Sequence, residues 1–380
     1  MAENNYAQDR DFLRKHTELI ELAGDDGSAV LVTPAWQGRA MTSTLDGDQG
    51  KSFGWLNAEF IASGEEDPTF NNYGGEDRFW LGPEAGQFGL WFDQGEPFDL
   101  AHWKTPQGFN RGAFEVVGRD GSGVEMAADF EVTNYSGTTF PCNVKRRIGL
   151  LGSAAAADLL GATLPAGVSM VGFESSNTLT NAGDSPWTPA AGLLSIWILG
   201  QFKPLPRGKV IVPFVEGDEG VLGRKVTTDY FGELPPERGR FTDGHFLFTC
   251  DGQFRSKIGV SPARAKDRLG SYDPDAKVLT VVQFSLPEDP AGRKWVNSLW
   301  EMQDEPFAGD VINSYNDGEE KPGAGQLGPF YEIETSSPAA DLAPGASIVH
   351  AHRTFHFSGH EDGLRALAAG VLGFDITAIG

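Results

Sequence analysis

The stretch YEIETSSPAADLAPGASIVHAHRTFHF, residues 331–357, consists of two runs of alternating side chains separated by a Pro-Gly turn. Successive side chains of a strand point to opposite faces, so Glu332 and Glu334 share one face of the first run. In the second run one face is polar and the other is largely apolar. The polar face carries His350, His352, Thr354 and His356, which include three of the chain's seven histidines. The pattern therefore predicts two strands joined by the turn segment LAPGAS.

Similar runs recur along the whole chain. The 49 glycines and 23 prolines are scattered, and they separate many short runs rich in β-branched and aromatic residues, which is typical of all-β proteins. The clearest further strand candidates are residues 28–36, 112–118, 124–135, 143–151, 193–202, 209–215, 245–250 and 277–286. Helical patterns are confined to residues 10–22, 153–161, 295–303 and 363–372. The sequence thus predicts an all-β fold, a large antiparallel β-sandwich with a few short helices.

The sequence contains neither a repeat of fixed period nor a shift in composition. A repeat would have indicated a propeller or a solenoid. A chain of 380 residues with 40% hydrophobic side chains can bury a substantial core. We therefore expect a single domain that spans residues 1–380.

The charge balance is strongly acidic. The chain has 53 acidic and 30 basic side chains and a formal net charge of −23, so its surface should repel nucleic acids and anionic membranes. The N-terminal segment lacks the basic and apolar regions of a secretory signal, and no apolar run approaches the length of a membrane span. These features predict a soluble, cytoplasmic protein, or a periplasmic or secreted one if a leader has been removed. The oligomeric state stays open.

Cofactor chemistry has little support in the sequence. Cys142 and Cys250 lie far apart and could form one disulfide or none. The patterns GxGxxG, GxxxxGK[ST], HExxH and GxSxG do not occur, which argues against nucleotide cofactors, zinc proteases and α/β-hydrolases. We expect neither a cofactor nor a metal site.

The two halves of the opening stretch contain the first candidate site residues. Glu332 and Glu334 could form a solvated acidic face, or one of them could act as a general base in a cleft. His350 and His352, two apart on a strand, could bind zinc with a third ligand. A polar sheet face that lines or borders the glutamate cleft is the interpretation that we favour.

The segment NNYGGEDRFW, residues 71–80, contains a second group. Glu76, Arg78 and Trp80 suit a sugar site, because a guanidinium binds hydroxyl or carboxylate groups and a ring stacks on a sugar face. A tight turn followed by a core strand is the alternative explanation. Further along, His102 stands next to Trp103 and is a candidate catalytic or structural histidine.

A third group lies in the second half of the chain. Arg255 and Lys257 share a strand face and could clamp an anion such as a uronic acid, or could pair with neighbouring carboxylates. His245 lies one predicted strand earlier, and a tight hairpin turn is predicted at 251–252. Asn316 precedes a glycine-rich loop, where it could bind a ligand or simply form a turn.

Together these segments resemble the aldose 1-epimerase (galactose mutarotase-like) superfamily, and more closely an uncharacterised bacterial branch of it. The resemblance spans nearly the whole chain. Its motifs are PAWQGRAMTST, NNYGGEDRFWLGPE, SSNTLTNAGDSPW, RSKIGV, YNDG and GPFYEIETSSPAADLAPGAS. The last motif is similar to the mutarotase segment in which a Glu is followed by Thr, Pro and a Pro-Gly turn. The resemblance implies a large antiparallel β-supersandwich.

The resemblance also implies roles for individual residues. Glu334 would be the general base that removes the anomeric hydroxyl proton, Arg78 would contact the sugar, and His102 would be the first active-site histidine. Mutarotases carry their acid histidine after an LTN-type segment, whereas here 178–181 run into Ala182 without one. His102, His245 or a histidine of residues 350–356 would then have to act as the acid.

The resulting functional prediction is a carbohydrate-binding protein that takes a mono- or oligosaccharide, and whose catalytic version is an aldose 1-epimerase-like isomerase. Two alternatives stay open. The missing histidine favours a non-catalytic sugar-binding or scaffold protein. The two cations at 255 and 257 favour a lyase or hydrolase that acts on polyuronide.

Overall fold

The largest layer of the molecule is a curved antiparallel sheet of ten strands. The computed structural model describes residues 4–379. In spatial order the strands are β11 (Gly239–Thr242), β12 (His245–Thr249), β10 (Lys209–Pro213), β14 (Arg268–Asp273), β15 (Val278–Phe284), β18 (Ser347–Gly359), β8 (Val168–Asn181), β7 (Thr139–Leu150), β6 (Gly123–Thr133) and β5 (Glu115–Arg119). The longest pairing joins β18 to β8 over thirteen residue pairs from Ser347↔Thr180 to Gly359↔Val168.

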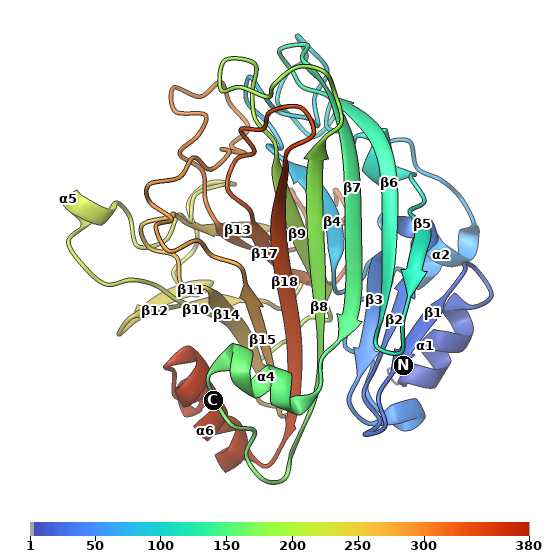
Figure 1. The fold of residues 1–380 in the computed structure, drawn as a ribbon. Coiled ribbons are helices and arrows are strands. Elements are labelled where there is room, and N and C mark those ends of the chain that lie inside the picture. The colour runs from blue at the N-terminus through green and yellow to red at the C-terminus, as the bar shows by residue number, and fades with distance from the viewer. Residues whose placement is uncertain (1–3, 380) are drawn as a thin grey trace.

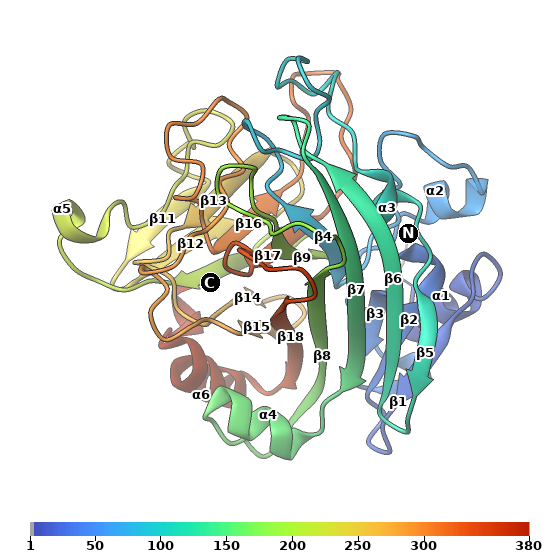
Figure 2. The same cartoon turned by 45° about the horizontal axis from the view of Figure 1, so that its top comes forward.

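A second antiparallel sheet lies behind the first, as Figures 1 and 2 show. Its five strands are β13 (Ser256–Val260), β16 (Ile312–Asn316), β17 (Tyr331–Ser336), β9 (Ser195–Phe202) and β4 (Arg78–Gly82). A third sheet at the N-terminal side contains β1 (Ile20–Ala23), β2 (Ala29–Thr33) and β3 (Arg39–Thr44). The predicted all-β supersandwich is confirmed, and each of the ten predicted strand runs contains a strand.

Apolar side chains from alternate strand positions fill the space between the two large sheets. Val210 and Val212 of β10 meet Ile258, Val260 and Ile333 of the smaller sheet, and each is fully buried. Burial of one such side chain stabilises the fold by roughly 1.5–3 kcal/mol. The core thus fixes which face of each strand of the smaller sheet is left for other contacts.

Helices cover one end of the opposite face of the large sheet. Phe355 and Phe357 of β18 pack there against α6 (Glu361–Leu372), with α4 (Ser153–Leu160) beside them (Figure 1). The side chain of His360 caps the N-terminus of α6, and Gly373 ends the helix with a φ of 70°. The other helices are α1 (Tyr6–Leu13), α2 (Ala58–Ser63), α3 (Gln107–Asn110), α5 (Glu219–Leu222) and the 3₁₀ turns η1 (Pro34–Trp36), η2 (Gly47–Gln49) and η3 (Ile376–Ile379).

Two of the four helix predictions are confirmed, at α4 and α6. The prediction for 10–22 is wrong in its extent, because α1 ends at Leu13 and β1 follows. The prediction for 295–303 is also wrong, since that segment is irregular. Tertiary contacts hold it instead of a helix, because the Glu84 N–H donates to Ser298 Oγ and the Gln303 N–H donates to Gln87 Oε1, each at 3.0 Å.

Strands β17 and β18 follow one another as predicted, but they belong to different sheets. The segment between them therefore crosses from one layer to the other. The predicted hairpin at 251–252 is likewise a crossing, because β12 and β13 lie in different sheets. Both cysteines are buried free thiols.

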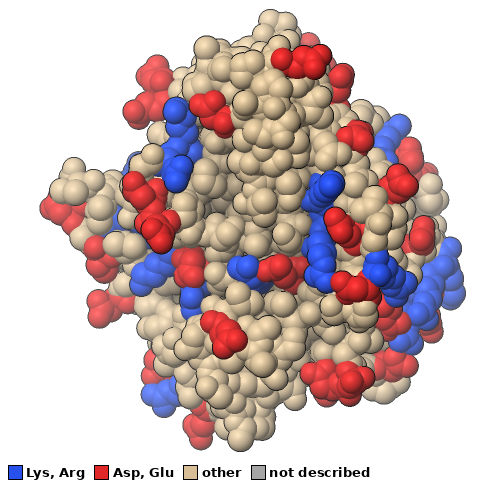
Figure 3. Space-filling model, viewed as in Figure 1, with Lys and Arg blue, Asp and Glu red and all other residues tan. Residues whose placement is uncertain are grey.

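On the face shown in Figure 3, Lys and Arg lie among Asp and Glu instead of gathering into one basic patch. Across residues 4–379, no helix has the length and apolar character that a bilayer crossing requires.

Candidate functional site

The outer face of the five-stranded sheet forms the floor of a cleft. Residues that pair directly across antiparallel strands share a face. Arg78 of β4 pairs with Leu199 of β9, and Leu199 pairs with Glu334 of β17. Two residue pairs further along, and so on the same face, Gln201 lies opposite Glu332. The strand register thus brings an arginine and two glutamates from distant parts of the chain onto one surface.

Aromatic side chains form the walls of this cleft, whose volume is about 460 Å³. The rings come from Phe70, Trp80, Trp103, Trp197, Phe231, Trp300, Tyr315 and Phe330. Polar groups are interspersed among them, including Asn72, Gln201, Glu84 and Glu332. Ring faces combined with a few polar groups suit a ligand that is itself amphipathic, such as a sugar.

Glu332 and Arg78 form a buried ion pair in the floor. The Nη2 atom of Arg78 lies 2.8 Å from Oε1 of Glu332. The guanidinium also lies over the ring of Trp80, with its central carbon 4.1 Å from the ring centroid. Burial raises the pKa of Glu332 to about 7, although Arg78 opposes this shift. Glu332 can therefore exchange a proton near neutral pH.

Glu334 is held by two donors. Its Oε2 atom accepts hydrogen bonds from Trp197 Nε1 at 2.9 Å and from Lys257 Nζ at 3.1 Å. Burial disfavours the charge on Lys257, but Glu334 and Glu84 outweigh it and raise the pKa of the ammonium group. The other oxygen, Oε1, is buried and has no hydrogen-bond partner among residues 4–379. A buried carboxylate oxygen without a partner is unusual and keeps its capacity to accept a proton.

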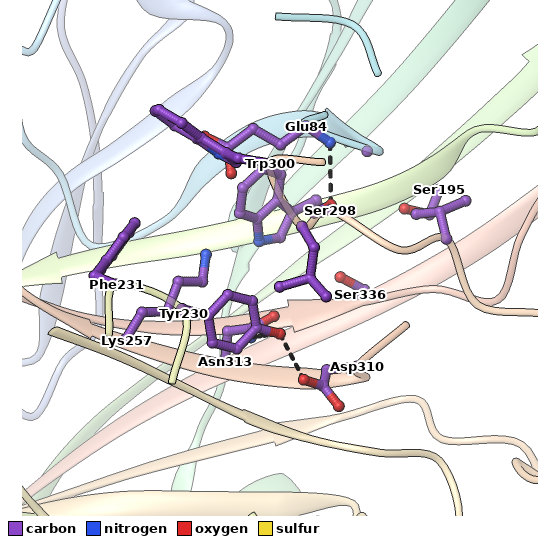
Figure 4. A pocket seen from close by; sticks show the side chains of 14 residues that line it. Glu84, Ser195, Tyr230, Phe231, Lys257, Ser298, Trp300, Asp310, Asn313 and Ser336 are labelled. Atoms are coloured by element: carbon purple, nitrogen blue, oxygen red, sulfur yellow. Dashed lines mark hydrogen bonds between the residues drawn. The ribbon is translucent and has the colours of Figure 1, made fainter. Parts of the chain in front are cut away.

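A smaller chamber adjoins the cleft and shares Trp197, Lys257 and Trp300 with it. Figure 4 shows Tyr230, Lys257, Asn313 and Asp310 close together in this chamber. Tyr230 Oη lies 2.5 Å from Asp310 Oδ2, and Asn313 Nδ2 donates to the same Oη at 3.1 Å. Burial raises the pKa of Asp310 to about 6.

The structure brings together five of the nine residues expected at the site. Arg78, Trp80, Arg255 and Lys257 line the cleft, and Glu334 contacts Lys257 from the floor. Arg255 immediately precedes β13, and its guanidinium carbon lies 3.9 Å from the ring centroid of Phe231. Of the two expected anion-binding cations, Lys257 is paired with a carboxylate, and Arg255 has no salt bridge within the described part of the chain.

The other four expected residues lie elsewhere. The His102 side chain is in an exposed loop, where Nδ1 lies 2.6 Å from Asp99 Oδ1. His245 lies on the far face of the large sheet, with Nε2 2.8 Å from the carbonyl oxygen of Leu372 in α6. Glu76 is buried between the sheets. Asn316 binds the backbone of Gly252 and Phe254, so it holds a turn.

The histidines of β18 also lie behind the floor and not in the cleft. Nε2 of His350 and Nδ1 of His352 each lie 2.8 Å from Thr335 Oγ1, which is on the core side of β17. His356 Nε2 lies 2.9 Å from Glu76 Oε2. These histidines therefore do not line the cleft but lie next to it, behind its floor, because β18 presents its polar face to the interior between the sheets. Within residues 4–379, His, Cys, Asp and Glu side chains do not gather in threes that could hold a metal ion.

Several cleft residues were not anticipated from the sequence. Trp197, Leu199 and Gln201 occupy one face of β9, a signal hidden in a continuous run of apolar residues. Glu84, Tyr230 and Asp310 come from loops, where no periodic pattern marks their direction.

Comparison of the sequence with models of known protein families assigns the chain to a family. A family model described as a family of unknown function (DUF6786) matches residues 4–380. The chain belongs to DUF6786. No curated protein matches it.

Solved structures of other proteins have a fold similar to that of this DUF6786 protein. The Slr1438 protein from Synechocystis sp. PCC 6803 is 13% identical, with a TM-score of 0.54 over 95% of this chain and 100% of that one. A "Putative aldose 1-epimerase" from Escherichia coli K12 is 12% identical, with a TM-score of 0.50 over 90% and 99%. A "putative aldose 1-epimerase" from Klebsiella pneumoniae is 10% identical, with a TM-score of 0.51 over 94% and 83%. The fold is therefore galactose mutarotase-like, as predicted.

Proposed function

We propose that this DUF6786 protein binds a mono- or oligosaccharide in the aromatic cleft and interconverts its anomers, with Glu334 as the general base. The observation that carries the proposal is the position of Glu334 directly beneath that cleft, where Oε2 is bound to the lining residues Trp197 and Lys257 and the buried Oε1 atom has no hydrogen-bond partner among residues 4–379. The similarity to proteins named as aldose 1-epimerases supports the same reaction class.

The cleft supports sugar binding through complementary chemistry. Trp103 and Trp300 offer ring faces on which the C–H face of a pyranose can stack. Asn72 and Gln201 offer amide groups for hydroxyls, and their side chains are 3.2 Å apart at the edge of the floor. Such a mixture of apolar area and a few oriented polar groups is typical of small-molecule sites.

The environment of Glu334 supports its role as a base. Trp197 and Lys257 bind one oxygen and hold the carboxylate in place, so the other oxygen keeps its lone pairs for a substrate proton. The anomeric hydroxyl is the most acidic hydroxyl of a free sugar and is a suitable donor to that atom.

Replacement of the carboxylate tests this proposal. Glu334→Gln keeps the size of the side chain but removes the base, so we expect anomer interconversion to slow by about 10²- to 10⁴-fold. Polarimetry or NMR exchange on a panel of aldoses measures the rate, and Glu174→Gln, in an ion pair on the large sheet, is a matched control. A wild-type protein that accelerates none of the sugars would defeat the proposal.

The non-catalytic alternative rests on a specific observation. Among the residues that line the cleft or the chamber there is no histidine, whereas the resemblance to mutarotases calls for one. Calorimetric titration separates the two candidates. Sugar binding without interconversion would favour a binding or scaffold protein, and the absence of any binding would remove both.

A further inference from the structure

The proposed reaction needs a proton donor as well as a base. Opening a pyranose ring requires a proton at the ring oxygen while the anomeric hydroxyl loses its own. All seven histidines lie within residues 4–379, and none lines the cleft or the chamber. The donor must therefore be another group close to Glu334.

Two nearby groups are already engaged. Lys257 donates to Glu334 at 3.1 Å and is held in that buried ion pair. Glu332 has a pKa that burial raises to about 7, but its Oε1 atom is held by Arg78 Nη2 at 2.8 Å. Neither is placed to release a proton to a ligand without breaking a buried ion pair.

The chamber offers a different group, and this inference rests on the proposed function. Asn313 lies directly opposite Glu334 in the pairing of β16 with β17, and its Nδ2 atom donates to Tyr230 Oη at 3.1 Å. The phenol is therefore hydrogen-bonded to the residue that stands beside Glu334 on the same face of the sheet. The carboxyl of Asp310 lies behind it, with Oδ2 at 2.5 Å from the same Oη atom.

A glycine leaves the space that Tyr230 and Asp310 occupy. Gly259 of β13 pairs with Asn313, and a Cβ atom at this position would collide with the carboxyl of Asp310 and lie 2.7 Å from Tyr230 Oη. Any larger residue would push the phenol and the carboxyl away from the sheet. The close approach of Tyr230 and Asp310 to the Glu334 face thus depends on the backbone at 259.

We propose that Tyr230 is the proton donor of the reaction and that Asp310 positions and reprotonates it. As the ring opens, the phenol donates its proton to the ring oxygen and takes the proton of the Asp310 carboxyl. The bond between C1 and the ring oxygen breaks, and its electron pair goes to that oxygen. Glu334 takes the anomeric hydroxyl proton as the C1 carbonyl forms. Rotation about C1–C2 and the reverse steps close the ring as the other anomer, and no other reactant is consumed.

The surroundings of Asp310 suit this role. Burial raises its pKa to about 6, with Tyr230, Thr227 and Lys257 opposing the shift. Part of the Asp310 population is therefore protonated at slightly acid pH, and this is the form that the step consumes. Because the rate depends on that form, it should fall as the pH rises above about 6.

The test compares two variants with a control. Tyr230→Phe should lower kcat for anomer interconversion by about 10²-fold, with the calorimetric Kd for the same sugar changed less than threefold. Asp310→Asn should lower kcat by about tenfold and abolish the decline in rate above pH 6. Tyr331→Phe removes another buried hydroxyl, one bonded to Ser271 Oγ at 2.7 Å in the core, and should keep full activity.

The outcomes separate this inference from the proposed function. A wild-type protein without interconversion of any sugar would overturn both. An active wild type together with a Tyr230→Phe variant of unchanged kcat would overturn the role of Tyr230 and leave Glu334 as the base. If Tyr230→Phe fails to fold, the pH profile of Asp310→Asn decides: an unchanged profile overturns the inference, and loss of the decline above pH 6 supports it.

Discussion

Strand β17 has two faces that differ in chemistry although they alternate within six residues. On the core side, the hydroxyl of Thr335 is bonded to the imidazoles of His350 and His352. On the cleft side, Glu332 is paired with Arg78 and Glu334 with Lys257. Both faces are buried, but the core side carries a neutral hydrogen-bond network and the cleft side carries ion pairs.

Burial therefore acts in opposite directions on the two faces. It lowers the pKa of His350 to about 3 and that of His352 to about 4, so both imidazoles are neutral at pH 7. It raises the pKa of Glu332 to about 7. The neutral network can serve the fold with little dependence on protonation near neutral pH, whereas the charged face is poised to exchange protons.

The largest effect on stability is expected on the core side. Thr335→Val keeps the shape of the side chain but leaves two buried imidazole nitrogens without this partner, which should lower the free energy of unfolding by about 2–5 kcal/mol. Urea unfolding measures the loss, and sugar affinity should stay within about twofold. Ser347→Ala removes an exposed hydroxyl at the start of β18 and serves as the control. A large loss of sugar affinity without a loss of stability would contradict the assignment of stability to the core side and of binding to the cleft side.

The second prediction concerns pH. A lowered histidine pKa means that the unfolded state binds more protons, so the stability that His350 contributes is present above pH 6.5 and declines as the pH falls toward 3. A raised Glu332 pKa has the opposite sign, and its contribution declines as the pH rises from 4.5 to 7. Each pKa unit corresponds to about 1.4 kcal/mol.

Differences between variant and wild type isolate these contributions. His350→Gln should gain stability relative to wild type as the pH falls below 6.5, and Glu332→Gln should gain relative to wild type as the pH rises toward 7. Chemical unfolding at pH 4, 5, 6 and 7 measures both. Slopes of the same sign for the two variants would contradict the contrast between the faces.

The smallest effect is expected at the rim of the cleft. Arg255 stacks on Phe231, which is 39% exposed, so Arg255→Met should weaken the binding of a neutral sugar by no more than about threefold. Calorimetry with matched neutral sugars and uronates measures this, with Arg365→Met in α6 as the control. A loss above tenfold that is restricted to uronates would favour the polyuronide alternative over an aldose.

Much of the fold could be predicted because strand periodicity is a local property. The run at 347–357 indicated a strand with a histidine face and a phenylalanine face, and β18 has both. Strand β8 was missed, because Ser175 and Asn177 stand at buried positions where apolar residues were expected. Their burial is satisfied by partners such as Arg146, which no local pattern reveals.

The candidate site could be predicted only in part. Arg78, Trp80 and Lys257 are of residue types that suit a sugar site, and their strands belong to one sheet. Residue type and chain order favour His102 and His245, but neither property determines which face of which sheet a residue occupies. Tyr230 and Asp310 lie in irregular segments, whose direction depends on packing against the rest of the molecule.

The sequence by itself determined the β class, the alternation of β17 and the shared face of Glu332 and Glu334, because these follow from the geometry of a strand and its neighbours in the chain. Only the tertiary structure decided that this face looks into an aromatic cleft and that the histidines lie behind it. The physical reason is that the turn at 342–347 carries the chain from one sheet to the other. The side of a strand that is covered therefore depends on the packing of two sheets built from distant segments.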